Sequence, residues 1–387
     1  MPEHAAISEA LDSVVADGLS PGLTAVVADR NGVIHASAHG ERALGSGTPM
    51  TTDSVFRIFS MTKAIGTAAA LKLVEEGGLA LDTPVEAILP DFAEIPVLEG
   101  WDGETPRLRR PKTPCTIRHL MTHTSGMTYD IWNAGQDRYM KHAEGAPTLT
   151  GQKSALKFFP MQFDPGTDWA YGMSTDWLGL CVEEAAGERI DAFLKREIFD
   201  PLGMGDTDVE FTPEMTLRKV AVHAATPEGW KVIEMELPSH PEFYGMGHAL
   251  NSTAEDYARF CRMILNGGEL DGVRVLAPET VAAMSENAIG DLRLTRQPTT
   301  NPQLGADIDL FPEIEKTFTL GFMRNEADIP GRRRAGALSW AGVMNTHYWI
   351  DPAAGVTAVL MMQHLPFVDP NALAAYDRFE RAVYAAL

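Results

Sequence analysis

Residues 59–76 read FSMTKAIGTAAALKLVEE, and this stretch decides which fold and which chemistry the chain is expected to have. The run from Ala64 to Glu76 is rich in helix-forming residues, so it predicts a helix with Ser60 at or just inside its N-terminus. Lys63 follows three residues later and therefore lies on the same helical face, one turn away. Free backbone N–H groups at a helix N-terminus favour negative charge on a nearby atom. Ser60 and Lys63 are thus a candidate nucleophile and base.

A serine and a lysine at this spacing are a weak signal by themselves, because the two residue types often meet there by chance. The alternative is a helix-capping Ser60 beside a solvent-exposed Lys63. An amine takes a proton from a hydroxyl only where burial or a neighbouring cation favours its uncharged form. Further motifs are needed to choose between these interpretations.

Six short motifs occur along the chain in the same order as in a known protein family. They are residues 60–63 (SMTK), 120–127 (LMTHTSGM), 165–174 (PGTDWAYGMS), 201–204 (PLGM), 252–257 (STAEDY) and 340–342 (WAG). With these motifs, which span nearly its whole length, the chain resembles the class C β-lactamase-like serine hydrolases, and within them the family VIII carboxylesterases. The resemblance implies an α/β fold of the α+β type, like that of β-lactamases and penicillin-binding proteins. An antiparallel sheet flanked by helices would carry an inserted, mainly helical domain.

The resemblance identifies Tyr171 as the family's catalytic tyrosine. A phenol acts as a base at neutral pH only where a cation beside it stabilises the phenolate. Lys63 would be that cation, and the two groups would share a proton. The alternative for Tyr171 is a half-buried tyrosine in a loop. The expected catalytic residues are therefore Ser60, Lys63 and Tyr171.

The motif at 340–342 is expected to line the acyl site from an edge strand. By the family pattern, the backbone N–H groups of Ser60 and Val343 form the oxyanion hole, where each donor is typically worth about 3–4 kcal/mol. A side chain at Gly342 would crowd the acyl group, although a strand glycine at a bulge is the alternative. The expected substrate-binding residues are Trp340, Ala341, Gly342 and Met173.

Two departures from the family pattern concern the substrate. β-Lactamases and DD-peptidases of this superfamily have Asn two residues after the tyrosine, where this chain has Met173. They have Lys or His at the start of the motif that corresponds to residues 340–342, where this chain has Trp340. Since an amide-binding group and a carboxylate-pairing cation are both missing, we expect a serine carboxylesterase for uncharged, short-chain esters. The alternatives are an acyltransferase, a β-lactam or amide hydrolase, and a penicillin-sensor-like protein that is acylated without turnover.

Composition limits the partners. Of the 387 residues, 53 are acidic and 32 basic, and the net charge of −21 disfavours nucleic acid and anionic membrane surfaces. No basic-then-apolar leader and no apolar run of about 18 residues is seen, so we expect a cytoplasmic protein. We further expect a monomer or homodimer whose partner is a small-molecule ester substrate. The three cysteines form no CxxC pair, so neither a disulfide framework nor a metal site is indicated, and no cofactor is expected.

Both ends of the chain predict a hairpin. Residues 23–28 and 33–38 are strand-like and meet at an Asn-Gly turn, the strongest short-range hairpin signal. Residues 343–350 and 356–362 are also strand-like, and a helix follows at about 372–385. One antiparallel sheet with packed helices would accommodate all of these elements.

The middle of the chain shows helical patterns broken by Pro/Gly loops and little strand alternation. We therefore expect residues 1–78 and 219–387 to form the α/β domain and residues 79–218 to form the inserted, mainly helical domain.

Three other patterns mimic catalytic motifs. Residues 18–22 satisfy GxSxG, but the nucleophile elbow of that type follows a strand and opens a helix, whereas here a helix precedes and a strand follows. His119 and His123 have the spacing of a zinc protease without the glutamate that acts as its base. His347 and His364 would serve a Ser-His-Asp triad only if lysine were not the base.

Overall fold

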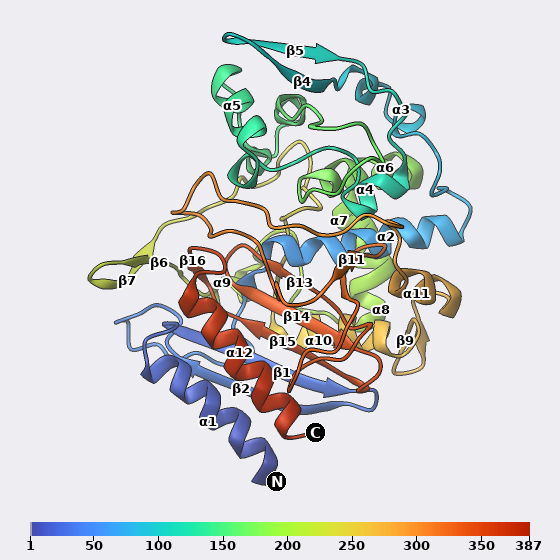
Figure 1. Ribbon diagram of the computed structural model, residues 1–387. Helices are drawn as coiled ribbons and strands as arrows, with labels where there is room; N and C mark the ends of the chain where they lie inside the picture. The colour runs from blue at the N-terminus through green and yellow to red at the C-terminus, as the bar shows by residue number, and fades with distance from the viewer. Residues whose placement is uncertain (1) are drawn as a thin grey trace.

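A seven-stranded sheet forms the centre of the protein (Figure 1). The computed structural model describes residues 2–387, and residues 2–4 by their backbone alone. All neighbouring strands are antiparallel, in the order β11, β12, β13, β14, β15, β1, β2. In chain order they are β1 (Gly22–Asp29), β2 (Val33–Gly40), β11 (Lys316–Phe318), β12 (Met323–Asn325), β13 (Leu338–Gly342), β14 (Thr346–Asp351) and β15 (Val356–Met361). The predicted fold class is confirmed.

Strands that are far apart in the sequence meet inside this sheet. β1 pairs with β15, so that Thr24 lies opposite Met361 and Asp29 lies opposite Val356. The hairpins predicted at the two ends are therefore neighbours in one sheet. The predicted strand at 343–350 starts three residues too early, because Asn345 has a left-handed backbone (φ 62°) and belongs to the turn before β14.

Helices cover both faces of the sheet, because alternate side chains of its central strands point to opposite sides. On β14, the ring of Tyr348 packs against Tyr257 of α10 with centroids 5.0 Å apart. Its neighbour Trp349 packs against Phe379 of α12 at 5.4 Å. α1 lies beside α12, and α2 runs above the sheet (Figure 1). These helices are α1 (Pro2–Ala16), α2 (Thr62–Glu75), α10 (Ala254–Leu265) and α12 (Pro370–Ala385).

The segment between α2 and residue 218 is mainly helical. Its helices are α3 (Val85–Ile88), α4 (Ile117–Thr122), α5 (Ala134–His142), α6 (Ser174–Ala186), α7 (Ile190–Leu194), α8 (Asp200–Leu202) and α9 (Pro213–Thr216). The hairpin of β4 (Val97–Asp102) and β5 (Thr105–Arg109), at the top of Figure 1, was not predicted. Most of its side chains are exposed or half-buried, so it lacks a regular apolar alternation. The domain boundaries stay a prediction.

Short elements complete the fold. They are β3 (Phe56–Arg57) paired with β8 (Asn251–Ser252), β6 (Val222–Thr226) paired with β7 (Gly229–Ile233) and β16 (His364–Leu365), β9 (Glu269–Leu270) paired with β10 (Val273–Arg274), and α11 (Pro278–Ser285). No helix in the described part of the chain is long and apolar enough to span a membrane.

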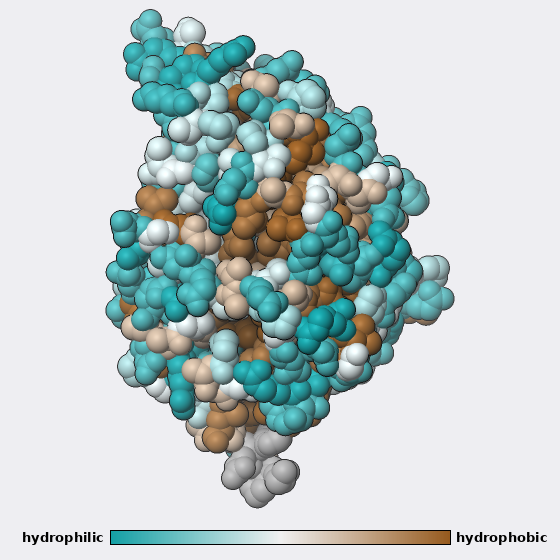
Figure 2. All heavy atoms as spheres, turned by 90° about the vertical axis from the view of Figure 1, so that its right-hand side faces the viewer, coloured by the Kyte–Doolittle hydropathy of each residue, from teal (hydrophilic) through white to brown (hydrophobic). Residues whose placement is uncertain are grey.

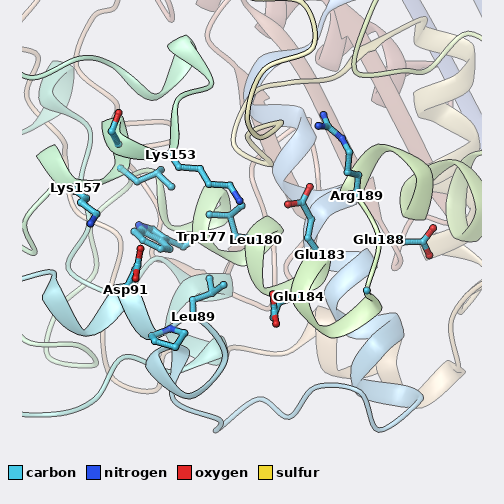
Figure 3. A pocket seen from close by; sticks show the side chains of 14 residues that line it. Leu89, Asp91, Lys153, Lys157, Trp177, Leu180, Glu183, Glu184, Glu188 and Arg189 are labelled. Atoms are coloured by element: carbon cyan, nitrogen blue, oxygen red, sulfur yellow. The ribbon is translucent and has the colours of Figure 1, made fainter.

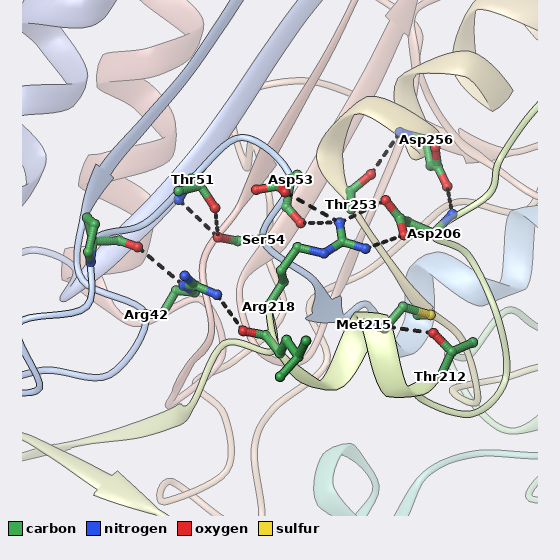
Figure 4. A network of polar contacts seen from close by, with 12 residues as sticks. Arg42, Thr51, Asp53, Ser54, Asp206, Thr212, Met215, Arg218, Thr253 and Asp256 are labelled. Carbon is green, nitrogen blue, oxygen red and sulfur yellow. Dashed lines mark hydrogen bonds and ion pairs between the residues drawn. The ribbon is translucent and has the colours of Figure 1, made fainter.

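A polar network lies at the N-terminus of α10 (Figure 4). Asp256, in the first turn, accepts hydrogen bonds from the backbone N–H of Asp206 at 2.7 Å and from the hydroxyl of Thr207 at 3.0 Å. Asp206 in turn pairs with Arg218 at 2.5 Å. Burial raises the pKa of Asp256 to about 6 despite these donors. The side chain that caps α10 is that of Thr253, the second residue of the STAEDY motif at 252–257.

Candidate active site

Ser60 and Lys63 lie together at the start of α2. Ser60 belongs to a single 3₁₀ turn, η1 (Phe59–Met61), that runs directly into α2, and Lys63 follows in the first turn of α2. The Nζ atom of Lys63 is 3.1 Å from the Oγ atom of Ser60. Since Lys63 is only 3% exposed, it is not the solvated surface lysine of the alternative interpretation.

The backbone just before Ser60 is strained. Phe59 has φ 42°, a left-handed conformation that non-glycine residues rarely adopt and that costs of order 1–3 kcal/mol. Its buried side chain packs with Val222, Met344 and Leu365, and this packing holds the conformation in place. The strained turn fixes where the next side chain, that of Ser60, emerges.

Lys63 has two further hydrogen-bond partners. They are the Oη atom of Tyr129 at 3.1 Å and the backbone carbonyl of Gly247 at 2.8 Å. Burial, the carboxylate of Asp176 and the neighbouring Tyr171 raise the pKa of Tyr129 well above its usual value, so it remains a neutral phenol at pH 7. Tyr129, which follows the LMTHTSGM motif by two residues, was not predicted, because nothing in the local sequence marks it as a partner of Lys63.

Tyr171 approaches Lys63 in a different way from the one expected. Its ring faces the amine, with Nζ 4.9 Å from the ring centroid. Its hydroxyl is buried and has no hydrogen-bond partner among the described residues. Trp340 and His123 hold the ring, with centroids at 4.7 and 5.1 Å. The expected proton-sharing contact between Lys63 and Tyr171 is therefore replaced by a contact between Lys63 and Tyr129, because aromatic packing fixes the ring of Tyr171 with its face toward the amine.

A buried carboxylate is linked to Lys63 through one backbone residue. Asp176 on α6 is fully buried, and its Oδ1 atom accepts the backbone N–H of Gly247 at 2.7 Å. The carbonyl of the same Gly247 binds Lys63, so a single residue links the carboxylate to the amine. A Cβ atom on Gly247 would lie 2.7 Å from Oδ1 of Asp176 and 3.0 Å from Oη of Tyr129, which leaves room only for glycine.

The edge of β13 lies against η1. A Cβ atom on Gly342 would lie 2.2 Å from the carbonyl oxygen of Ile58, so glycine is needed for the close approach of the strand to the turn that carries Ser60. Crowding of the acyl group, the reason expected from the sequence, is thus not the main one. Through this approach, Val343 and Ser60 line the same cavity, as an oxyanion hole built from both would require.

The other residues expected to bind substrate lie behind this surface. Trp340 packs on Tyr171, Met173 is fully buried just before α6, and Ala341 is buried within the sheet. Neither these three nor Gly342 is part of the lining of the cavity in the described structure. The motifs therefore locate the wall of the site, whereas most of its inner surface comes from other segments.

The cavity at Ser60 has a volume of about 650 Å³. Much of its lining comes from residues 129–149, which follow the LMTHTSGM motif, and the rest from residues 59–60, 159, 235, 248, 301, 304, 343–344 and 365. Its apolar residues include Ile131, Trp132, Met140, Leu149, Phe159 and Leu304. The charged side chains on its lining are Asp130, Asp137, Lys141 and Glu144.

A second hollow, of about 840 Å³, lies beside α6. The face of the molecule that lies to the right in Figure 1 is hollowed, with hydrophobic surface inside the hollow (Figure 2). In Figure 3, Trp177 and Leu180 lie near one another, with Asp91, Lys153 and Lys157 around them. Neither Ser60 nor Lys63 lines this hollow, so it is distinct from the candidate active site.

The motif mimics have structural roles. The hydroxyl of Ser20 donates to a backbone carbonyl two residues on, and the Nδ1 atom of His119 accepts the N–H of Thr116 in a helix-capping box. His347 and His364 are buried, and burial lowers the pKa of each to about 3, so both are uncharged at neutral pH. No cluster of His, Cys, Asp and Glu able to hold a metal ion occurs within the described residues.

Comparison with known proteins adds independent information. The family model described as Beta-lactamase matches residues 7–382. Monacolin J acid methylbutanoyltransferase of Aspergillus terreus is 31% identical over 358 residues, which cover 87% of this chain and 83% of that protein. Lovastatin esterase of Penicillium rubens is 31% identical over 364 residues, or 88% of either chain. The unliganded structure of simvastatin synthase from Aspergillus terreus has a TM-score of 0.81 and 28% identity, and covers 100% of this chain and 98% of that one.

Proposed function

The chain belongs to the β-lactamase family, as its motifs predict, and on that premise we propose that it hydrolyses carboxylic esters through an acyl-enzyme on Ser60. The observation that carries the proposal is the buried contact of 3.1 Å between the Oγ atom of Ser60 and the Nζ atom of Lys63. A hydroxyl at the start of a helix, beside an amine and open to a largely apolar cavity, is suited to attack an uncharged acyl group.

Acylation uses the three contacts of Lys63. When its amine is uncharged, two N–H bonds point to Gly247 and Tyr129, and the lone pair faces the hydroxyl of Ser60. As Oγ attacks the ester carbonyl, its proton passes to Nζ, and the backbone N–H groups of Ser60 and Val343 stabilise the oxyanion. Tyr129 lines the cavity as a neutral phenol, so it donates a proton to the departing alkoxide and recovers one from the ammonium of Lys63.

Deacylation repeats these steps with water as the nucleophile. Water gives one proton to Lys63 while its oxygen attacks the acyl carbon, and the bond to Oγ of Ser60 breaks. The proton returns to Oγ, and the carboxylic acid leaves.

Transfer of the acyl group to an alcohol is the second candidate function. The relatives named above include a methylbutanoyltransferase and an esterase, and the mainly apolar walls at Ser60 favour an organic acceptor over water. The two functions share the acyl-enzyme and differ only in the nucleophile that resolves it. Membership of family VIII, a cytoplasmic location and a monomeric or homodimeric state stay predictions.

The test is steady-state hydrolysis of a short p-nitrophenyl ester by the wild type, Ser60→Ala and Lys63→Ala. Each variant is expected to lose at least about 10³-fold in kcat/KM, because nucleophile and base act as one unit. Retained activity in Ser60→Ala would exclude Ser60 as the nucleophile. Mass spectrometry of the quenched wild type should show one acyl group on the peptide that contains Ser60.

Two additions separate the alternatives. An added alcohol acceptor yields a new ester in place of free acid if transfer is the main reaction. Nitrocefin is expected to be turned over far more slowly than the ester, since Trp340 and Met173 replace the family's cation and asparagine. A stoichiometric burst without steady turnover would indicate a penicillin-sensor-like protein.

A further inference from the structure

The cavity at Ser60 carries an uneven set of charges. Asp130, Asp137 and Glu144 line it as acids, and Lys141 lines it as a base. Lys141 is already paired with Asp137, at 2.7 Å from Nζ to Oδ2. His248 also lines the cavity, but burial lowers its pKa, so it adds no positive charge at neutral pH. Among the described lining residues, two negative charges therefore remain unbalanced.

These two charges belong to Asp130 and Glu144. Neither carboxylate forms an ion pair with any of the described residues. Asp130 directly follows Tyr129, the hydrogen-bond partner of Lys63, and both residues line the cavity. Its side chain is half-buried, and burial raises its pKa. Backbone N–H groups of Asp130 and Ile131 and the charge of Lys141 partly offset this rise in pKa. A partly desolvated carboxylate without a direct ion-pair partner repels a second anion and attracts a cation.

The rest of the cavity is apolar and larger than a short-chain ester requires. Side chains such as Trp132, Met140 and Phe159 enclose much of its volume of about 650 Å³. Binding energy would come from burying apolar surface there, and the acidic groups would decide which substrate charge is tolerated.

We propose that this cavity selects bulky apolar esters that are neutral or cationic, and that Asp130 and Glu144 reject esters that carry a carboxylate. This inference rests on the proposed ester hydrolysis at Ser60. It goes beyond the lack of a carboxylate-pairing cation, because the repulsion comes from acids that belong to the site.

The test compares three p-nitrophenyl esters with acyl chains of equal length. One ends in a methyl group, one in a carboxylate and one in a trimethylammonium group. At low ionic strength the wild type is expected to process the carboxylate ester at least about tenfold more slowly than the methyl ester, judged by kcat/KM. The ammonium ester should react at least as fast as the methyl ester. Added salt should reduce the difference, since screening weakens the repulsion.

Variants assign the effect to its residues. In the double variant Asp130→Asn/Glu144→Gln, kcat/KM for the carboxylate ester divided by kcat/KM for the methyl ester is expected to rise by about tenfold. Asp91→Asn/Glu184→Gln is the matched control, because it also removes two negative charges but from the lining of the other hollow, beside α6. It should leave the ratio as in the wild type.

The outcomes separate this inference from the function on which it rests. Equal rates for the three esters in the wild type, or an unchanged ratio in the double variant, would overturn the charge selection and leave ester hydrolysis intact. If turnover is too slow to measure, the same ratios are read from the rate at which each ester acylates Ser60. If no ester acylates Ser60, both proposals fall.

Discussion

Lys63 binds three groups that come from three separate parts of the chain. Ser60 lies in the 3₁₀ turn that leads into α2, Tyr129 comes from the mainly helical segment, and Gly247 comes from the segment before α10. A lysine held by three partners has little freedom to turn away from the serine. Its burial and these three contacts therefore keep the amine beside the hydroxyl of Ser60.

Replacing the two tyrosines separately tests which phenol takes part in proton transfer. We expect Tyr129→Phe to lower kcat by about 10²–10³-fold, because general acid–base catalysis typically contributes 10²–10⁴-fold. Tyr171→Phe should stay within about tenfold of the wild type, since it removes a hydroxyl that makes no hydrogen bond in the described structure. Steady-state kinetics together with thermal melts of both variants would show whether either change acts through folding.

The family pattern predicts the opposite order, with Tyr171 as the essential phenol. If Tyr171→Phe loses more activity than Tyr129→Phe, its ring must turn toward Ser60 when substrate binds. The matched pair therefore decides between the resemblance and the observed contact.

The sequence predicted the active-site contact between residues that are close along the chain, but it did not predict the contacts between distant residues. Ser60 and Lys63 are one turn apart, so helical spacing alone brings them together. Tyr129 and Gly247 reach Lys63 only through tertiary packing, and no local pattern contains that information. The sequence predicted that a side chain at Gly342 would be excluded, but the atom that such a side chain would meet, the carbonyl oxygen of Ile58, was visible only in the structure.

Single elements carry charge arrangements whose effects depend on pH. Asp256 lies in the first turn of α10. Its carboxylate accepts two hydrogen bonds, yet burial raises its pKa to about 6. Asp164, beside the β5 strand, accepts two hydrogen bonds from Arg109, and this contact lowers its pKa to about 2. The two carboxyl groups should therefore affect stability with opposite slopes.

Because the pKa of Asp256 is raised on folding, its contribution to stability is present below pH 4 and is lost as the pH rises through 6. Relative to the wild type, Asp256→Asn is expected to gain up to about 2 kcal/mol in the free energy of unfolding between pH 4 and pH 7. Urea unfolding at several pH values measures this change. A constant difference between the two proteins would contradict it.

Asp164→Asn provides the control of opposite sign. Its lowered pKa means that the stability from the contact with Arg109 is present above pH 4 and is lost as the pH falls through 2. The variant should be less stable than the wild type at pH 7 and equal to it near pH 2.

Elements with strong local signals were predicted well, and elements without them were not. The helix α12 appears where apolar periodicity placed it, because its buried residues repeat every three to four positions. The β4–β5 hairpin is largely exposed, so its sequence has no such repeat.

One buried ion pair links three segments that are distant along the chain. Arg333 and Glu380 on α12 are both fully buried, with 2.7 Å between Nε and Oε1. The guanidinium also lies over the rings of Phe311 and Trp349, at 4.7 and 5.3 Å from their centroids. A loop, an internal strand and the last helix therefore depend on the same contact.

Breaking this pair should destabilise the fold without changing the chemistry at Ser60. We expect Glu380→Gln to cost about 3–5 kcal/mol, because it leaves Arg333 charged and unpaired in the core. The double variant Arg333→Met/Glu380→Leu should recover most of that loss, since a well-packed apolar pair often replaces a buried ion pair without cost. Urea unfolding measures both, and the ester assay well below the melting temperature should give wild-type kcat. Independent, additive losses would contradict the coupling.

The sequence predicted which helices and strands the fold contains more completely than it predicted how they pack together. Both terminal hairpins and the helical middle were expected, because each is encoded locally. The cavity at Ser60 depends on how residues 129–149, Asn301 and Leu304 come together with Ser60 and Val343, and such long-range packing follows no periodicity. Its charge character therefore became visible only with the structure.

The pairing of β1 with β15 also constrains how the protein is made. Asp29 and Val356 are partners about 330 residues apart, so a ribosome that adds 5–20 residues per second needs roughly 20–60 s to supply the second after the first. During that time the β1–β2 hairpin has an open edge able to pair with other nascent chains. The yield of folded protein should thus depend on translation speed and on chaperones that cover this edge while synthesis continues.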